Sequence, residues 1–358
     1  TSGDFVLTSS GDVQLTGRTA AAGNVTVDSA GTLAISGATQ ANNNMSLRGA
    51  NVALGGSISA ANGLDASATG NLDSTGTVLA NRVQLGADGN LRLGGQIESR
   101  GDIALRAGQQ LDNSAQVVAI GQLQAQAARI AQQQNARLAA QGSVQLTARD
   151  QLDNAGIIIG AVGTGITAGR LDNRGQIYGQ RDATVAVSGA LNNSGLIGAA
   201  QNLEVRAGQL QQSSSAELSA GGNATVDVAG SADNAGQLIA ENTLQLKADT
   251  LTNTGVTAAG NATLTVGALD NRGTVLGSNA LDVTATRRLD NAAPGGLRAG
   301  NTLNLRPAPL DDAGEVVSDN DLTVIADALT NRQRLEAGPQ LQLQAGTLNQ
   351  SAQGLAVA

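Results

Sequence analysis

Residues 171–177 read Leu-Asp-Asn-Arg-Gly-Gln-Ile, and residues 191–197 read Leu-Asn-Asn-Ser-Gly-Leu-Ile. The opening triplet, or a close variant of it, marks a unit that recurs along the chain. Full copies begin at Leu111, Leu152, Leu171, Leu191, Leu251, Leu269, Leu289 and Leu329. Degenerate copies begin at Ile130, Leu210, Ala232, Leu310 and Leu348, and Val13, Leu33, Val52, Leu72 and Leu91 continue the spacing upstream. Successive markers from Leu111 onward lie 18 to 22 residues apart, and a repeat of this period predicts a solenoid of stacked coils.

One copy of the unit, residues 251–266, shows what each repeat encodes. Leu251 is expected to point inward, and Gly255 is expected to turn the chain into a second short strand. In the closing segment, Leu264 and Val266 alternate with threonines, which is the period of a half-buried strand. Gly or Asn occurs at nearly every corner, where we expect positive φ angles. Each repeat therefore predicts two or three short strands joined by tight turns.

A single coil of this kind cannot fold alone. Its four or five aliphatic side chains contribute roughly 1.5–3 kcal/mol each on burial, whereas ordering the backbone costs about 1–2 kcal/mol for each of roughly twenty residues. Stacking closes this gap, because each coil pairs its backbone with its neighbours at a spacing of ~4.8 Å. We therefore predict an all-β fold, a parallel β-helix of about eighteen coils and roughly 85 Å in length.

The third position of the triplet is most often asparagine. A buried amide needs hydrogen-bonding partners, and the equivalent amide one coil away can supply them. We interpret this position as a structural ladder along the stack, and not as a ligand site. The predicted ladder residues are Asn113, Asn154, Asn173, Asn193, Asn234, Asn253, Asn271, Asn291 and Asn331.

The composition narrows the range of functions. The chain has no cysteine, so disulfides are not expected, and no histidine, the usual general base and commonest metal ligand. The net charge of −8 argues against a nucleic-acid partner, for which a basic stripe is expected. No run of eighteen apolar residues is present, so no membrane-spanning segment is expected. Neither a signal peptide nor a polar cap is recognisable, and we expect a piece of a longer chain.

Two flavours of repeat follow one another along the chain. Residues 1–110 are Gly-rich with few triplets, and residues 111–358 carry the Leu-Asp-Asn form. We interpret them as one continuous, monomeric rod. Residues 122–141 are rich in Ala and Gln and could form a helix by propensity, but the apolar spacing favours strand. The longer steps after Ile130 and Leu210, and the prolines near residues 294 and 307–309, predict bulged loops, where a binding function could be placed.

The pattern Leu-Asp-Asn-x-Gly-x-Ile/Val, followed by a turn and Leu-x-Leu-x-Ala, resembles the repeats of filamentous haemagglutinins and related contact-dependent growth-inhibition exoproteins. The resemblance covers the whole chain and is most specific over residues 111–350. It implies a right-handed β-helix that serves as the stalk of a large secreted or cell-surface protein of a Gram-negative bacterium. The parent protein would cross the outer membrane through a two-partner secretion transporter and project adhesive, receptor-binding or toxin modules. The family's Asn-Pro-Asn-Gly and Val-Glu-Asn-Asn motifs are absent, so neither secretion signalling nor toxicity is assigned to these residues.

Other functions were weighed against the stalk. The main alternative is an adhesin surface that recognises a glycan or protein receptor. Arg287, Arg288, Arg298 and Arg306 form the candidate contact for an anionic ligand. A polysaccharide-cleaving enzyme needs paired carboxylates in one cleft, whereas the recurring aspartates occupy one repeat position, so no enzyme, catalytic residue, metal or cofactor is predicted. Calcium-binding nonapeptides and a continuous Thr-x-Thr ice-binding face are not present either.

Overall fold

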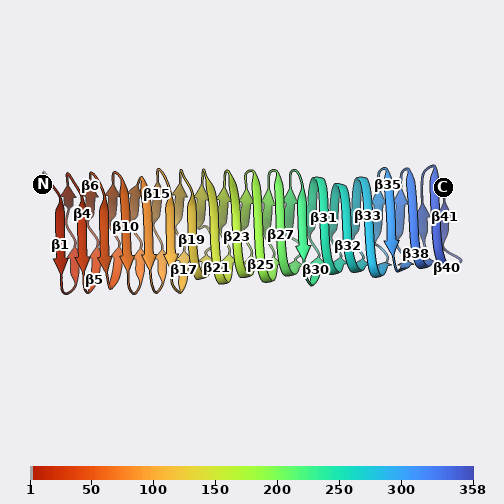
Figure 1. The fold of residues 1–358 in the computed structure, drawn as a ribbon, viewed down its shortest axis with the longest axis horizontal. Helices are drawn as coiled ribbons and strands as arrows, with labels where there is room; N and C mark the ends of the chain where they lie inside the picture. Colours follow the sequence, from red (N-terminus) through yellow and green to blue (C-terminus); the bar gives the residue numbers. More distant parts are fainter. Residues whose placement is uncertain (1–2) are drawn as a thin grey trace. The chain divides into compact units, whose positions relative to one another are not determined.

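The computed structural model describes residues 3–358, and all of the regular structure in that range is β-strand. Strands about twenty residues apart in the sequence pair in parallel, and the stack has about 18 turns. The predicted all-β parallel solenoid is therefore confirmed (Figure 1), while its right-handed winding stays a prediction from the family resemblance. No helix that could cross a bilayer is found in residues 3–358.

The chain forms two compact units, Thr1–Gln180 and Arg181–Ala358. The first strands of unit 1 are β1 (Phe5–Ser9), β2 (Val13–Leu15), β3 (Thr19–Ala21), β4 (Val25–Ser29), β5 (Thr32–Ile35), β6 (Ala38–Ala41), β7 (Met45–Gly49), β8 (Asn51–Leu54), β9 (Ser57–Ala60), β10 (Gly63–Ala68), β11 (Leu72–Ser74) and β12 (Thr77–Ala80). The rest of unit 1 comprises β13 (Arg82–Ala87), β14 (Leu91–Leu93), β15 (Gln96–Ser99), β16 (Ile103–Ala107), β17 (Gln110–Asn113), β18 (Gln116–Ala119), β19 (Leu123–Gln132), β20 (Arg137–Ala140), β21 (Ser143–Asn154), β22 (Ile157–Gly160), β23 (Gly163–Asn173) and β24 (Gln176–Gly179). Unit 2 comprises β25 (Asp182–Asn193), β26 (Leu196–Ala199), β27 (Asn202–Gln212), β28 (Glu217–Ala220), β29 (Ala224–Val228), β30 (Ser231–Asn234), β31 (Gln237–Asn253), β32 (Val256–Asn271), β33 (Thr274–Asn291), β34 (Gly296–Ala299), β35 (Thr302–Pro307), β36 (Pro309–Asp312), β37 (Glu315–Ser318), β38 (Asp321–Asn331), β39 (Arg334–Glu336), β40 (Gln340–Gln350) and β41 (Leu355–Val357).

In each unit, every coil contributes to three sheets. The strand that carries the triplet forms the marker sheet, as β17 does by pairing with the end of β19. The next strand forms the second sheet, as in the pairing of β18 with β20. The third strand forms the closing sheet, as in the pairing of β16 with the start of β19. Long strands such as β33 pass through all three sheets without a break in strand structure.

The pairing register places each marker residue beside its predicted equivalent in the next coil. In unit 1 this column runs through Val13, Leu33, Val52, Leu72, Leu91, Leu111, Ile130, Leu152 and Leu171. In unit 2 it runs through Leu191, Leu210, Ala232, Leu251, Leu269, Leu289, Leu310, Leu329 and Leu348. Most of these side chains are fully buried. Because a slip of one residue would turn every one of them to solvent, this column fixes the register.

The Ala- and Gln-rich stretch forms strands, as the apolar spacing indicated. Residues 123–132 are β19 and residues 137–140 are β20. Leu123, Ile130 and Leu138 are fully buried and lie in register with their equivalents in neighbouring coils. Helix propensity is overridden here because an extended chain buries all three side chains against both adjacent coils.

The longer coils take up their extra residues at one corner. In a regular coil, two residues separate the marker strand from the second-sheet strand, as between Asn113 and Gln116. Four residues separate them after Gln132, Gln212 and Asn291. Each of these longer connections is a turn closed by a backbone hydrogen bond, from Ala136 to Gln133 (3.1 Å), from Ala216 to Ser213 (3.0 Å) and from Gly295 to Ala292 (2.7 Å). Three of the expected loops are therefore compact turns. The loop expected at residues 307–309 is wrong, because Pro307 ends β35, Pro309 begins β36 and Ala308 alone separates them.

The reason expected for the glycines at the corners is wrong. Among the described residues no glycine has positive φ, and the non-glycine residue with this conformation is Asn135, with φ 66°. The glycines are required by the adjacent coil instead. A Cβ atom on Gly37 would overlap the carbonyl oxygen of Gly17, and one on Gly56 would overlap that of Gly37. Gly255 meets Gly236 in the same way. Glycine is used because the backbones approach too closely for any side chain.

Candidate functional site

The third triplet position forms a chain of buried amides in unit 2. The Nδ2 group of Asn234 donates to Oδ1 of Asn253 at 2.9 Å, and Asn253 donates to Asn271 at 2.9 Å. Asn271 donates to Asn291 at 2.8 Å, and Asn291 donates to Oδ1 of Asp312 at 2.9 Å. All five side chains are at most 5% exposed. Each bond joins one coil to the next, inside the stack.

Each ladder amide also bonds to backbone groups. Nδ2 of Asn253 donates to the carbonyl of Thr274, 3.1 Å away in the next coil. Oδ1 of Asn154 accepts a hydrogen bond from the backbone N–H of Gly156 at 3.2 Å, and Asn331 accepts one from Gln333 at 3.1 Å. Because its donors and acceptors are occupied in this way, a buried amide avoids the cost of unmade hydrogen bonds.

The remaining predicted ladder residues occupy the same position. Asn113 donates to Oε1 of Gln132 at 2.8 Å, and Asn154 donates to Asn173 at 2.7 Å. In unit 2, Asn193 donates to the carbonyl of Glu217 at 3.1 Å, and Asn331 donates to that of Leu355 at 3.1 Å. In these contacts, all nine asparagines form hydrogen bonds either with the ladder residue of an adjacent coil or with the backbone.

Three further ladder members were not included in the sequence prediction. Gln132 and Gln212 occupy the asparagine position and are at most 4% exposed, and Asp312 is fully buried there. Gln212 donates to Oδ1 of Asn234 at 3.1 Å. The sequence signal for these three residues is their position two residues after the marker. The prediction missed them because the triplet copies that contain them are degenerate, with glutamine or aspartate in place of asparagine.

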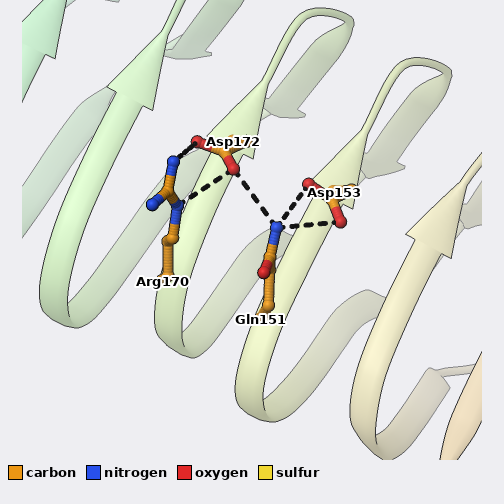
Figure 2. A network of polar contacts seen from close by, with 4 residues as sticks. All are labelled: Gln151, Asp153, Arg170 and Asp172. Atoms are coloured by element: carbon orange, nitrogen blue, oxygen red, sulfur yellow. Dashed lines mark hydrogen bonds and ion pairs between the residues drawn. The ribbon is translucent and has the colours of Figure 1, made fainter.

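Polar side chains on the outer face of the marker sheet form hydrogen bonds with one another, within and between coils (Figure 2). Nε2 of Gln151 donates to both carboxylate oxygens of Asp153, at 2.9 and 3.0 Å, and to Oδ2 of Asp172 at 3.2 Å. Arg170 donates to both oxygens of Asp172, at 3.0 and 3.2 Å. The hydrogen bond to Asp172 raises the pKa of Arg170. Asp153 and Asp172 thus lie side by side on the sheet surface, one bonded to an amide and one to a guanidinium group, and do not form a cleft.

The four arginines of the candidate anion-binding cluster lie on different sheets of unit 2. Arg288 is on the marker sheet beside Ala268, and Arg287 precedes it. Arg298 is on the second sheet, in register with Leu276, and Arg306 is on the closing sheet, in register with Thr284. The side chains therefore face three directions.

Three of these arginines are engaged with carboxylates. Arg287 reaches back two coils to Asp249, with Nη1 2.7 Å from Oδ1, and this hydrogen bond lowers the pKa of Asp249. Nη1 of Arg288 is 2.6 Å from Oδ1 of Asp270. Nη2 of Arg298 is 2.5 Å from Oε2 of Glu315. A ligand would have to compete with these partners.

A groove of about 550 Å³ lies on the outer face of the closing sheet in unit 1. It crosses the strands β10, β13, β16, β19 and β21. The groove exists because Gly86 and Ala104 are smaller than the residues beside them in the neighbouring coils. Arg106 lies over the groove, with Nη2 3.2 Å from Oε1 of Gln126. The other polar lining residues are Asp65, Ser67, Gln84, Gln124, Gln145 and Thr147.

Neither this groove nor the ladder assembles a metal centre. No group of three or more carboxylate, histidine or cysteine side chains suited to holding a metal ion occurs among residues 3–358. Chemically, the ladder holds the coils together inside the stack, and the groove presents side-chain amides and one guanidinium group on its outer face.

Comparison with protein families gives one match. The family model described as the haemagglutinin repeat matches residues 118–223 and 198–273. No curated protein and no solved structure matches the chain. The matched residues include the strands β19 to β32, with the ladder positions from Gln132 to Asn271. Residues 118–273 of this chain thus match the haemagglutinin repeat and form a repeat region of the filamentous haemagglutinin type.

Proposed function

We propose that this chain is a structural stalk segment of a large secreted bacterial exoprotein. The observation that carries the proposal is the like-with-like stacking of marker residues together with the buried amide ladder. Each coil is bound to its neighbours by parallel backbone pairing and by apolar contacts, and the coils from Asn113 onward also by side-chain amide hydrogen bonds. A structure of this kind can be lengthened coil by coil and needs no reaction centre.

The wider setting follows from the haemagglutinin-type repeats. In this proposal the parent protein leaves a Gram-negative cell through a two-partner secretion transporter and stays at the cell surface or is released. Its other regions supply adhesion, receptor binding or toxicity, and this segment holds them at a distance from the cell. Contact with a target cell is then made by those regions.

The stalk function can be tested by changing its length in register. Deleting residues 251–288 removes two whole coils and joins Thr250 directly to Leu289, which occupies the position of Leu251. In the parent protein, we expect this deletion to preserve secretion and the activity of the distal module, with a shorter reach from the cell. Deleting residues 251–279 instead joins Thr250 to Ala280 at the start of a closing strand, and it should disrupt the coils at the junction. Loss of target recognition on the in-register deletion, with normal surface display, would refute a purely structural role.

A second candidate function is direct recognition of a receptor or glycan by the closing-sheet groove of unit 1. The observation that favours it is the row of amides from Gln124, Gln126 and Gln145 beside Arg106 over a floor of small residues. Amide and guanidinium groups can bond to sugar hydroxyls and carboxylates.

Binding of the labelled chain to target cells separates the two candidates. The stalk predicts no saturable binding. Recognition by the groove predicts saturable binding that is lost in a Gln124→Ala, Gln145→Ala double variant. Gln245→Ala, on the closing sheet of unit 2 and outside the groove, is the matched control. If both variants bind like the original chain, the groove is not the recognition surface.

A further inference from the structure

One ladder position in unit 2 carries a carboxylate in place of an amide. Asp312, on β36, lies in register between Asn291 on β33 and Asn331 on β38. Its side chain is fully buried. Asparagine occupies the same repeat position in the coils before and after it. Asp312 must therefore do both things that an amide does there: accept a hydrogen bond from one coil and donate a hydrogen bond to the next.

Asp312 fills the accepting role. Its Oδ1 atom accepts from Nδ2 of Asn291 at 2.9 Å and from the backbone N–H of Gly314 at 3.2 Å. These are the two bonds that Oδ1 of an asparagine accepts at this position, as Oδ1 of Asn154 does from Gly156. The backward half of the ladder is therefore intact at Asp312.

The donating role is not filled. Oδ2 of Asp312 is buried and has no hydrogen-bond partner among the described residues. In the preceding coils the corresponding atom is Nδ2, and that of Asn271 donates to Oδ1 of Asn291 at 2.8 Å and to the carbonyl of Gly296 at 3.3 Å. The equivalent groups ahead of Asp312 are Oδ1 of Asn331 and the backbone carbonyl of Arg334, given the register of β36 with β38 and of β37 with β39. Both are acceptors, and an ionised carboxylate has no proton to donate to them.

We propose that Asp312 is a proton-dependent link of the ladder, which joins its coil to the next when Oδ2 is protonated and opens that junction when the carboxyl group ionises. With the proton in place, Oδ2–H donates forward as the amide of asparagine does. Without it, a buried negative charge faces two oxygen acceptors. Since a solenoid is stabilised by nearest-neighbour contacts, the loss is local to the coils around residues 310–350.

The electrostatic surroundings of Asp312 favour the protonated form. Burial is the largest effect and raises the pKa, the hydrogen bonds from Asn291 and Gly314 lower it, and the charge of Asp311 raises it again. The result is a pKa of about 7. The carboxyl group therefore changes its charge near neutrality, about three units above an unfolded aspartate at ~3.9.

Three ion pairs lie near this position. Arg332, after β38, is 3.0 Å from Asp311, Arg298 on β34 pairs with Glu315 on β37, and Arg334 pairs with Glu336 on β39. The charged groups on the elements packed against Asp312 are Asp282, Arg287, Arg288 and Asp290 on β33, Asp311 on β36, Glu315 on β37, Asp321 and Asp327 on β38, Arg332 after it, and Arg334 and Glu336 on β39. Of these charges, Asp311 contributes to the shift of Asp312. No cation contacts the buried carboxylate among the described residues.

The sign of the pH dependence follows from the raised pKa. Between about pH 4 and pH 7 the folded chain holds a proton on Asp312 that the unfolded chain has lost, so folding becomes less favourable as the pH rises. The stabilisation is complete below about pH 4 and is lost by the time the pH has passed 7. The unfolding equilibrium constant of these coils should rise by up to about tenfold for each pH unit in this window.

The test compares the chain with its Asp312→Asn variant. Hydrogen exchange by mass spectrometry, expressed as protection relative to intrinsic exchange rates, is measured for residues 310–350 from pH 4.5 to 8. We expect protection in the original chain to fall by about a hundredfold between pH 5 and 7, and protection in Asp312→Asn to stay level. Asp311→Asn, which alters the half-buried neighbour, is the matched control. It should keep the fall but move it to lower pH, because the charge of Asp311 raises the pKa of Asp312.

Direct titration provides a second measurement that needs no variant to fold. The 13C resonance of the Asp312 carboxyl carbon should titrate near pH 7, well above the ~3.9 of an unperturbed aspartate. A titration below pH 5, or parallel pH profiles for the original chain and Asp312→Asn, would overturn the proposal. Lower protection in Asp312→Asn at every pH would also overturn it, because the carboxylate would then have a partner that an amide cannot replace.

Discussion

The coils before residue 100 and those after residue 110 fill the same interior position with different kinds of side chain. In the earlier coils the third position of the marker strand is apolar, with Leu15, Ile35, Leu54 and Leu93 in one column. In the later coils that column is the amide ladder, which begins at Asn113. Both columns are buried. The position thus demands agreement between neighbouring coils, and not a particular residue type.

The exceptions in each column support this reading. Ser74 stands in the apolar column between Leu54 and Leu93, and its buried hydroxyl group has no hydrogen-bond partner among the described residues. Asp312 stands in the amide column, and its Oδ2 atom lacks a partner in the same way. Each is a polar group whose neighbours cannot satisfy it. The two regions are therefore best compared by exchanging their side chains.

The largest effect is expected from placing an amide in the apolar column. Ile35→Asn removes a buried side chain whose transfer contributes about 2 kcal/mol, and it buries an amide between Leu15 and Leu54 at a further cost of about 2 kcal/mol. We expect unit 1 to lose about 4 kcal/mol of stability, measured by urea denaturation. Ile35→Leu is the control and should cost less than about 1.5 kcal/mol. Similar losses for the two variants would show that the column tolerates amides.

The reverse exchange, Asn253→Leu, should cost somewhat less. It removes the donor to Asn271 and to the carbonyl of Thr274 and the acceptor for Asn234. Asn234 keeps the carbonyl of Val256 at 3.0 Å, so part of the loss is offset. We expect about 3 kcal/mol, from two or three groups left without partners, measured by denaturation and by hydrogen exchange of residues 234–274. Asn253→Gln retains the amide and should lose less; an equal loss would mean that shape, and not bonding, controls the ladder.

The smallest effect should be a gain. Ser74→Val replaces an unbonded buried hydroxyl group with a methyl group between two leucines, and we expect stabilisation of about 1 kcal/mol, seen as a higher Tm. Ser99→Val is the matched control, because the Ser99 hydroxyl is bonded to the carbonyls of Asn81 and Asp102 at 2.9 and 3.0 Å. This control should destabilise the chain. If Ser74→Val also lowers the Tm, close packing around residue 74 outweighs the unbonded hydroxyl group.

Much of the fold could be predicted from the sequence, since one marker residue per coil fixes the register. Leu251 and Leu269, for example, are paired as their spacing implied. The role of the corner glycines could not be predicted in this way. Gly56 looks like a residue chosen for its own conformation, but what requires it is the Gly37 carbonyl one coil away. Local patterns do not reveal a contact between segments that are nineteen residues apart.

The candidate site was harder to predict for a related reason. Asn271 and its equivalents follow from the triplet, but recognising Gln132 and Asp312 as ladder members needs their register and not their residue type. The arginines near residue 288 are close in sequence, yet each coil turns twice within twenty residues, so Arg298 and Arg306 face other directions. The groove depends on Gly86 lying beside Arg106 across coils, which sequence proximity cannot indicate.

The longer turns after Gln132, Gln212 and Asn291 all lie at one edge of the coil, where the marker strand meets the second strand. Two additional residues enter there while the adjacent strands keep their register. Length changes at this edge leave the interior columns and the sheet pairing in place. The same edge is therefore where a foreign peptide, an epitope tag or a whole inserted module could be grafted at the lowest cost, and where sequence drift between related chains should concentrate.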